Sequence, residues 1–210
     1  MKSLFGFRTL RFAVWFTAVL MMAACKKDKE QDREELLLSA GSKASWKGYL
    51  ENGYFNSGNI EITANGIFLE NDKIVGGQVR IPVSSIVVTS ELLSTDEKAA
   101  LLAHLKTDAF FNLAVHPDVI YTISSAEKMA VDGQGNNYLI KGSMKLLGKD
   151  LILDIPAKIQ ISNASVKVDT KFSFDRTKWG MTYTSSDDLP PADKIKNNIE
   201  VELSLNATRF

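Results

Sequence analysis

Apolar and polar residues alternate with a period of two along most of the chain after residue 44. In each alternating run, every second side chain is aliphatic or aromatic, and most of those between are polar, although Ile152 interrupts the polar side of one run. The clearest runs are 60–63, 78–83, 151–161, 166–174 and 199–206. Strict alternation is typical of β-strands with one buried face and one face in water. The pattern therefore predicts about eight strands of this kind.

Turn-forming residue pairs separate the alternating runs. They are Asn65-Gly66, Asn71-Asp72, Asp132-Gly133, Gly148-Lys149 and Ser162-Asn163. Such pairs favour antiparallel connections between neighbouring strands. Strands of this number form a closed barrel or a sandwich, and closure removes the exposed edges that invite aggregation. We therefore predict a mainly all-β domain; a barrel of about eight strands has room for its own side chains or for one small ligand.

The segment 94–106 departs from the period of two. Its sequence, STDEKAALLAHLK, is rich in residues that favour helices. Ser94 followed three residues later by Glu97 forms a capping box, which marks a helix start. Leu101, Leu102 and Leu105 then recur at helical spacing. The segment predicts a single amphipathic helix among the strands.

The first 24 residues have the pattern of a secretory signal peptide. Lys2, Arg8 and Arg11 precede the apolar run FAVWFTAVLMMAA, which ends in small residues. The run is too short to span a bilayer as a helix, for which about 20 apolar residues are needed. We therefore predict that residues 1–24 direct export and are then removed.

Cys25, the only cysteine, directly follows this apolar run. The segment LMMAAC resembles the lipobox of bacterial lipoproteins, although Met22 stands where leucine is usual. The resemblance implies that Cys25 is acylated and anchors an exported protein in the cell envelope, on the periplasmic side or in the outer membrane. The alternative is an ordinary signal peptide followed by a chance cysteine. A lone thiol excludes an internal disulfide bond.

The stretch 25–41 is predicted to be a tether that leads to a domain of residues 42–210. It contains the charged run KKDKEQDREE and shows no apolar periodicity before Leu36. The whole chain has 25 basic and 25 acidic residues, and removal of the signal peptide leaves 22 against 25, a net charge of −3. Because nucleic-acid partners require a basic face, this mildly acidic balance argues against them.

The segment 104–121 resembles the central signature of the YceI-like family. A helix ends in His104-Leu105, a polar turn and the pair Phe110-Phe111 follow, and Pro117 leads into a strand. Further matching pieces occur in the expected order, namely Ser45-Trp46-Lys47-Gly48, Gly76-Gly77, Tyr138 to Gly142, and the run FSFDRTKWG from Phe172 to Gly180. The resemblance covers residues 42–208. It departs from the family pattern at Ala109, at His116 and in the loop 53–58, which lacks a histidine.

The resemblance implies an extended, lipocalin-like antiparallel barrel whose interior holds a long isoprenoid chain. Family members are periplasmic or secreted, and several are linked to isoprenoid quinones. The implied ligand is therefore an isoprenoid lipid or a quinone, with no other cofactor. A tether anchored at Cys25 would keep the mouth of such a barrel close to the membrane. Whether two barrels pair into a homodimer is not decided by the sequence.

The predicted ligand contacts are the inward-facing apolar side chains, with Arg176 for a polar head group. They are Trp46, Val79, Ile81, Leu101, Leu105, Phe110, Phe111, Ile140, Leu153, Ile155, Val168, Phe172, Phe174, Arg176 and Leu203. Each buried CH₂ group contributes about 0.8 kcal/mol, so a long tail needs few polar contacts. Alternatively, the same side chains fill the barrel, the two phenylalanines plug its core, and Arg176 pairs with Asp175 or another acid. The protein would then be a structural barrel that binds an envelope protein.

The sequence contains no pattern typical of a catalytic or metal site. His104 and His116 are the only histidines, and their spacing is not that of zinc ligands. The chain has no second cysteine, no Gly-x-Ser-x-Gly nucleophile motif and no glycine-rich phosphate loop. We therefore predict that the protein is not an enzyme and holds no metal.

Overall fold

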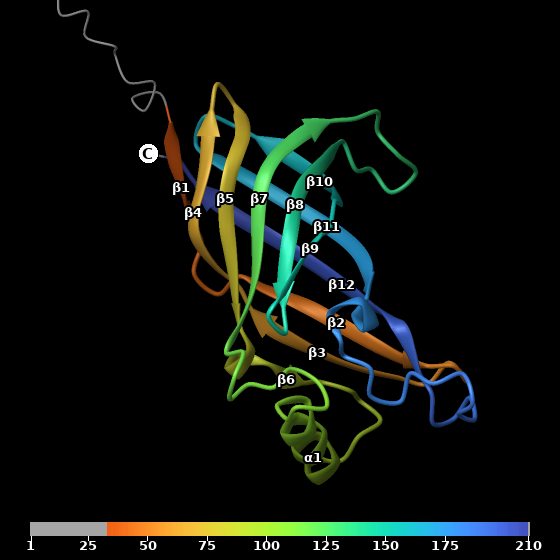
Figure 1. Cartoon of the computed structure of the whole chain (residues 1–210). Coiled ribbons are helices and arrows are strands. Elements are labelled where there is room, and N and C mark those ends of the chain that lie inside the picture. The colour runs from red at the N-terminus through yellow and green to blue at the C-terminus, as the bar shows by residue number, and fades with distance from the viewer. Residues whose placement is uncertain (1–32, 210) are drawn as a thin grey trace, which may run out of the picture.

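The computed structural model describes residues 33–209, which form one strand-rich body with a helix at one end (Figure 1). The first strands are β1 (Glu34–Leu38), β2 (Lys43–Leu50), β3 (Phe55–Glu61), β4 (Thr63–Glu70), β5 (Lys73–Pro82) and β6 (Val87–Val88). The helix α1 (Thr95–Leu105) follows. The later strands are β7 (Asp118–Lys128), β8 (Tyr138–Leu146), β9 (Lys149–Ile152), β10 (Ile155–Ile161), β11 (Ser165–Asp175) and β12 (Ile195–Thr208). Two 3₁₀ turns, η2 (Val83–Ser85) and η3 (Arg176–Trp179), complete the described elements.

Several of these segments are halves of one bent strand. Both β1 and β2 pair antiparallel with β12, β3 continues into β4 across Ile62 alone, and β9 and β10 both pair with β8. Likewise β5 pairs with β4, whereas β6, which follows η2, pairs with β3. The ring therefore has eight positions, which are β1/β2, β3/β4, β5/β6, β7, β8, β9/β10, β11 and β12. The predicted closed antiparallel barrel of about eight strands with one helix is confirmed.

The turns show where the sequence pattern was informative and where it misled. Asn71 and Asp72, with φ of 50° and 57°, form the predicted turn between β4 and β5. Asn65-Gly66 is not a turn but lies inside β4, where the pairing with β5 shifts register. A β-carbon on Gly77 of β5 would lie 2.7 Å from the Ile67 Cα, so this bulge brings the two backbones too close for any larger residue.

The predicted helix is present. It begins after Ser94, whose hydroxyl accepts a hydrogen bond from the Glu97 N–H at 3.3 Å, while the Glu97 carboxylate accepts one from the Ser94 N–H at 2.8 Å. This is the predicted capping box. Leu105 is buried, and Leu101 and Leu102 are half-buried against the barrel. The helix has eleven residues, and nothing in the described part of the chain has the length and hydropathy of a membrane-spanning helix.

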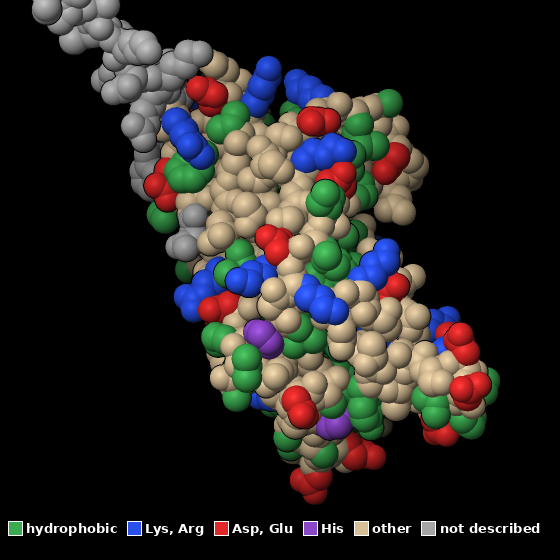
Figure 2. Space-filling view, viewed as in Figure 1, with side chains coloured by type: hydrophobic (Ala, Val, Ile, Leu, Met, Phe, Trp, Pro, Cys, Tyr) green, Lys and Arg blue, Asp and Glu red, His purple; other side chains and the backbone are tan. Residues whose placement is uncertain are grey.

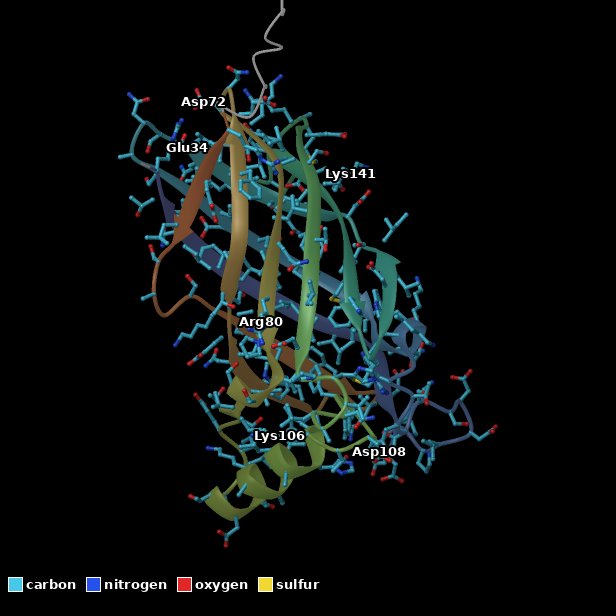
Figure 3. The ribbon with its side chains drawn as sticks, turned by 60° about the vertical axis from the view of Figure 1, so that its left-hand side comes forward. Glu34, Asp72, Arg80, Lys106, Asp108 and Lys141 are labelled. Atoms are coloured by element: carbon cyan, nitrogen blue, oxygen red, sulfur yellow. The ribbon has the colours of Figure 1, made fainter. Side chains whose placement is uncertain are left out.

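The region predicted as a tether contains a strand. β1, which starts at Glu34, pairs with β4 and with the end of β12, and its Leu36 is buried. Arg209 ties this end together, because its guanidinium contacts the carboxylates of Glu34 and Asp72, both labelled in Figure 3. The described part of the predicted tether thus includes β1, and the domain boundary at residue 41 stays a prediction. The predicted signal peptide and Cys25 lie outside the described residues, so they stay predictions.

Candidate functional site

The inward-facing side chains of the barrel do not meet at its centre but surround a cavity of about 270 Å³. The cavity extends from Leu36, Ile67 and Ile74, which are buried at the β1 end, to the half-buried Leu101 and Phe111 at the α1 end. Strands from all eight positions of the ring and the helix contribute to the wall.

Every predicted ligand contact except Arg176 lines this cavity. The residues concerned are Trp46, Val79, Ile81, Leu101, Leu105, Phe110, Phe111, Ile140, Leu153, Ile155, Val168, Phe172, Phe174 and Leu203. Their positions follow from strand geometry, since residues two apart point to the same face of a strand. Pairing between strands then places inward-facing residues side by side. Phe172 of β11 and Trp46 of β2 both pair with Val201 of β12, which lies between them. Whether they contact a ligand stays a prediction.

The wall of the cavity is apolar and carries no charged side chain among the described residues. In the interior, the Tyr121 hydroxyl donates to the Leu153 carbonyl at 2.8 Å, and the Thr170 hydroxyl donates to the Pro156 carbonyl at 2.6 Å. Burial, followed by the nearby Asp154 carboxylate, raises the pKa of Tyr121, so this hydroxyl stays neutral. These two hydroxyl groups are already paired and so give water little to bind, whereas the buried indole nitrogen of Trp46, a residue of the wall, has no hydrogen-bond partner.

Charged side chains are instead distributed over the outer surface, where both signs are mixed (Figure 2). On the outer face of the wall, Arg80 pairs with Asp118 at 2.7 Å, and Lys141 pairs with Asp154 at the same distance. Lys106 and Asp108 lie at the α1 end, opposite Glu34 and Asp72 (Figure 3). In the described part of the chain, no three His, Cys, Asp or Glu residues gather where they could hold a metal ion.

The two predicted phenylalanines form part of the end wall beside α1. Phe110 is buried, and its ring packs against His104 and Tyr183 with centroid distances of 5.2 and 5.3 Å. Phe111 is half-buried and also lines the cavity. His104 thus packs within an aromatic cluster at the end of the helix.

Arg176 does not lie at the cavity. Its side chain is fully buried, and its guanidinium donates to backbone carbonyl oxygens at distances from 2.6 to 3.3 Å. The acceptors belong to Met181, Tyr183, Ile195 and Lys196. The Asp175 carboxylate accepts from the N–H and hydroxyl of Thr177 and forms no ion pair with Arg176. The structure thus corrects the expected head-group contact, because Arg176 fastens the segment after η3 to the start of β12.

Sequence reasoning missed the polar residues at the rim of the cavity. Tyr49, Tyr54 and Asn56 line it, and all three lie at or near the turn between β2 and β3. Asn56 and Gly58 occupy inward positions of β3, so the strand shows little apolar alternation. The absence of a β-carbon on Gly58 leaves room for the Trp46 indole, since an added β-carbon would lie 2.6 Å from that ring.

The geometry defines a class of protein: a small closed β-barrel built around an apolar cavity. The model of the YceI-like domain family matches residues 40–207, which is most of the barrel. The chain belongs to the YceI-like domain family. The matched range agrees with the resemblance read from the sequence over residues 42–208.

Solved structures with the same fold are distant in sequence. BcnA from Burkholderia cenocepacia is 15% identical, with 80% of this chain and 96% of that chain covered and a TM-score of 0.60. A polyisoprenoid-binding domain from Saccharophagus degradans is 13% identical, with coverages of 84% and 98% and a TM-score of 0.59. The YceI protein of Campylobacter jejuni is 19% identical, with coverages of 72% and 83% and a TM-score of 0.52. No curated protein matches the chain.

Proposed function

We propose that this protein is a non-catalytic carrier that holds an isoprenoid lipid or the tail of a quinone in its barrel, anchored in the bacterial envelope by acylated Cys25. The observation that carries the proposal is the cavity, which is apolar, uncharged and as long as the barrel. The polyisoprenoid-binding domain of Saccharophagus degradans, which shares the fold, supports the choice of ligand class.

The size of the cavity favours a ligand over a barrel filled by its own side chains. Empty core volume costs about 24 cal/mol per Å³, so an empty cavity of about 270 Å³ would cost on the order of 6 kcal/mol. That is a large fraction of the roughly 5–15 kcal/mol by which domains are stable. A prenyl chain would occupy this volume and restore the lost contacts, so the ligand-bound form is expected to be the more stable one.

Ligand extraction tests the proposal directly. Protein purified from its native envelope is extracted with organic solvent, and the extract is identified by mass spectrometry. We expect a prenyl lipid in near-stoichiometric amount, and re-addition of a prenyl lipid to the stripped protein should raise its melting temperature because ligand binding stabilises the folded state. If no lipid is recovered and added prenyl lipids leave the melting temperature unchanged, the binding function is wrong.

A pair of adjacent substitutions separates binding from stability. Leu153 is half-buried and lines the cavity, whereas Ile152 is 83% exposed. Leu153→Gln places an amide against the bound tail, where burial of an unpaired polar group costs about 1–3 kcal/mol, so lipid affinity should fall about tenfold. Ile152→Gln should bind like the unmodified protein. Equal lipid affinity of both variants, measured by titration calorimetry, would contradict a ligand in this cavity.

The anchor is tested by fractionation. Cys25→Ser removes the thiol that acylation requires, so the protein should move from the membrane to the soluble fraction. Several acyl chains on one residue hold a protein stably, whereas one chain holds only marginally, so the shift should be near complete. A variant that stays with the membrane would show that another feature holds the protein there.

A further inference from the structure

The wall of the barrel contains one stretch where neighbouring strands are not paired through their backbones. β10 and β11 pair only over residues 158–161 and 166–169. Beyond this ladder β9 pairs with β8 alone, and the rest of β11 pairs with β12 alone. Figure 1 shows that β8 and β11 run in clearly different directions. We call the boundary between residues 150–156 and residues 170–175 the seam.

Pro156 explains why the ladder between β10 and β11 ends. Its carbonyl oxygen accepts a hydrogen bond from the Thr170 hydroxyl at 2.6 Å, so this carbonyl faces β11. In an antiparallel ladder a residue uses its N–H and its C=O toward the same neighbouring strand. Pro156 would therefore have to donate to β11, and proline has no N–H. A single hydrogen bond from the Thr170 side chain thus stands where the ladder would have continued.

The backbone groups along the seam lack backbone partners. The Leu153 N–H donates to the Gly142 carbonyl of β8 at 3.0 Å, so the backbone groups of its neighbours Ile152 and Asp154 point away from β8 and toward the seam. Within the described part of the chain, no backbone hydrogen bond joins them to β11, which has no pairing partner on this side after Asp169. By contrast, β11 pairs with β12 without interruption along its whole length.

The other end of the seam is held by the turn η3. The indole N–H of Trp179 donates to the Met144 carbonyl of β8 at 2.8 Å, and the same ring packs edge-on against Phe174 of β11 at a centroid distance of 5.5 Å. The seam is therefore limited by two hydrogen bonds from side chains, one from Thr170 to Pro156 and one from Trp179 to Met144.

The cavity lies directly behind the seam. Leu153 and Ile155 line the cavity from one side of the seam, and Phe172 and Phe174 line it from the other. Leu153, Phe172 and Phe174 are only half-buried. At this place, the wall consists of side chains from two strands that no backbone ladder joins. Side chains change rotamer much faster than paired strands separate, so this is the part of the wall that opens with the least loss of structure.

Given the proposed lipid-binding function, we infer that the ligand enters and leaves the cavity sideways through the seam, which opens when the hydrogen bonds of Thr170 and Trp179 break. A chain that lies along the barrel can pass through such a gap without being threaded through one end. β9 stays paired with β8 and β11 with β12 during opening, so the rest of the ring keeps its structure.

A reversible cross-link across the seam tests the inference. The register of β10 and β11, extended past Pro156, places residue 173 opposite residue 154. Asp154→Cys and Ser173→Cys are combined with Cys25→Ser, so that no third thiol is present, and are joined by a bifunctional thiol reagent with a reducible bond. Uptake and release of a fluorescent prenyl lipid, followed by transfer from and to vesicles, should both slow by at least about tenfold and recover on reduction.

A second cross-link is the matched control. Lys171 of β11 and Glu202 of β12 are directly paired and both exposed, so Lys171→Cys with Glu202→Cys joins two strands that are already held by a ladder. In the same Cys25→Ser chain, this cross-link should leave both transfer rates unchanged. Equal slowing by both cross-links would show that any stiffening of the barrel hinders transfer, and the seam would not be the route.

Substitutions at the end of the ladder test the seam without a cross-link, which covers the case that the cysteine variants do not fold. Thr170→Val removes one of the two hydrogen bonds and should raise both rates about threefold to tenfold. Pro156→Val restores the missing N–H and should lower both rates. Because a gate is crossed in both directions, the equilibrium affinity for the lipid should stay the same in each variant. Weaker affinity with an unchanged uptake rate would contradict a gate at this position.

The outcomes distinguish this inference from the proposed function. If the cross-link across the seam leaves both transfer rates unchanged, the ligand passes through an end of the barrel, and the inference is wrong while the lipid-binding function stands. If the protein without any cross-link takes up no prenyl lipid from the vesicles, the proposed function itself fails, and the inference fails with it.

Discussion

Arg176 shows how a residue that suggests ligand binding in the sequence can have a structural role. An arginine beside a tryptophan near the end of a strand suggested a contact with a polar head group. In the structure its guanidinium is surrounded by carbonyl oxygens, and burial lowers its pKa, the effect being only partly offset by Asp175. The planar group with its several donors suits this arrangement, because it satisfies carbonyls that would otherwise be buried without partners.

We expect Arg176→Leu to be among the most destabilising single substitutions in the barrel. It leaves up to four carbonyl oxygens without their donor, and each buried unsatisfied group costs about 1–3 kcal/mol before relaxation, so a total near 3 kcal/mol is expected. Urea unfolding measures this loss. Lys178→Leu, on an exposed residue of the same turn, is the control and should change stability little. If Arg176→Leu lowers the free energy of unfolding by less than 1 kcal/mol, water must satisfy the carbonyl oxygens in place of the guanidinium.

The apolar lining could be predicted from the sequence because alternation fixes which side chains face inward. That reasoning placed residues such as Val79 and Ile155 correctly at the cavity wall. It could not find Asn56, because the inward positions of β3 include an asparagine and a glycine, which resemble a loop in composition. Nor could it place Arg176, because its partners are backbone carbonyl oxygens 5 to 20 residues further along the chain, and contacts with backbone atoms produce no side-chain pattern in the sequence.

β1 is the strand that the sequence pattern did not predict. Its Leu36, Leu37 and Leu38 form an apolar run without alternation, preceded by a dense run of charges. The strand exists because it pairs on both sides, with β4 and with β12, and because Leu36 reaches the cavity wall. The pairing with β12 joins residues about 170 positions apart, such as Leu37 and Thr208, and the pairing with β4 joins residues more than 30 positions apart, such as Leu36 and Ile67, so local composition carries no information about them.

We expect β1 to be required for ligand retention. A shortened chain that begins at Ala40, close to where the family match starts, lacks the strand that closes the ring between β4 and β12. It should melt at a lower temperature and release a prenyl lipid faster, because the β1 end of the cavity then opens to water. Lipid release is followed by transfer to acceptor vesicles.

A second shortened chain, which begins at Gln31, is the matched control for the loss of the charged run. It keeps β1 and also Arg33, whose guanidinium lies 3.8 Å from the centre of the Phe68 ring on β4. This chain should retain the melting temperature and lipid release rate of the longer protein. If both shortened chains behave alike, β1 does not close the cavity in solution.

The two ends of the barrel carry different elements. The chain enters at β1 and leaves at the end of β12, and these two points lie together at the end opposite α1 (Figure 1). The other end of the cavity, which Leu101 and Phe111 line, lies beside α1. The arrangement follows from antiparallel pairing, because β1 and β12 run in opposite directions and so place the start of one beside the end of the other. The alternation in the sequence predicted the number of strands. Which elements lie at the same end of the barrel depends instead on the order of the strands around the ring.

This arrangement changes the expected orientation at a membrane. If Cys25 is the anchor, residues 26–33 reach at most about 30 Å before β1 begins, and they attach to the β1 end of the barrel. The segment 91–108 around α1 carries four acidic and two basic residues, a net charge of −2. An anionic bilayer surface attracts basic segments by about 1 kcal/mol per charge and correspondingly repels acidic ones. The α1 end is therefore expected to face away from the membrane.

Site-specific labels in the acylated protein test this orientation. Lys73→Cys places a fluorophore at the start of β5, and Ala99→Cys places one on an exposed position of α1. Cys25 is the only cysteine in the chain. With the protein on anionic vesicles that carry a quencher on the lipid head groups, the label at 73 should be quenched and the label at 99 should not. Stronger quenching at 99 than at 73 would show that the α1 end faces the bilayer and would contradict the expected orientation.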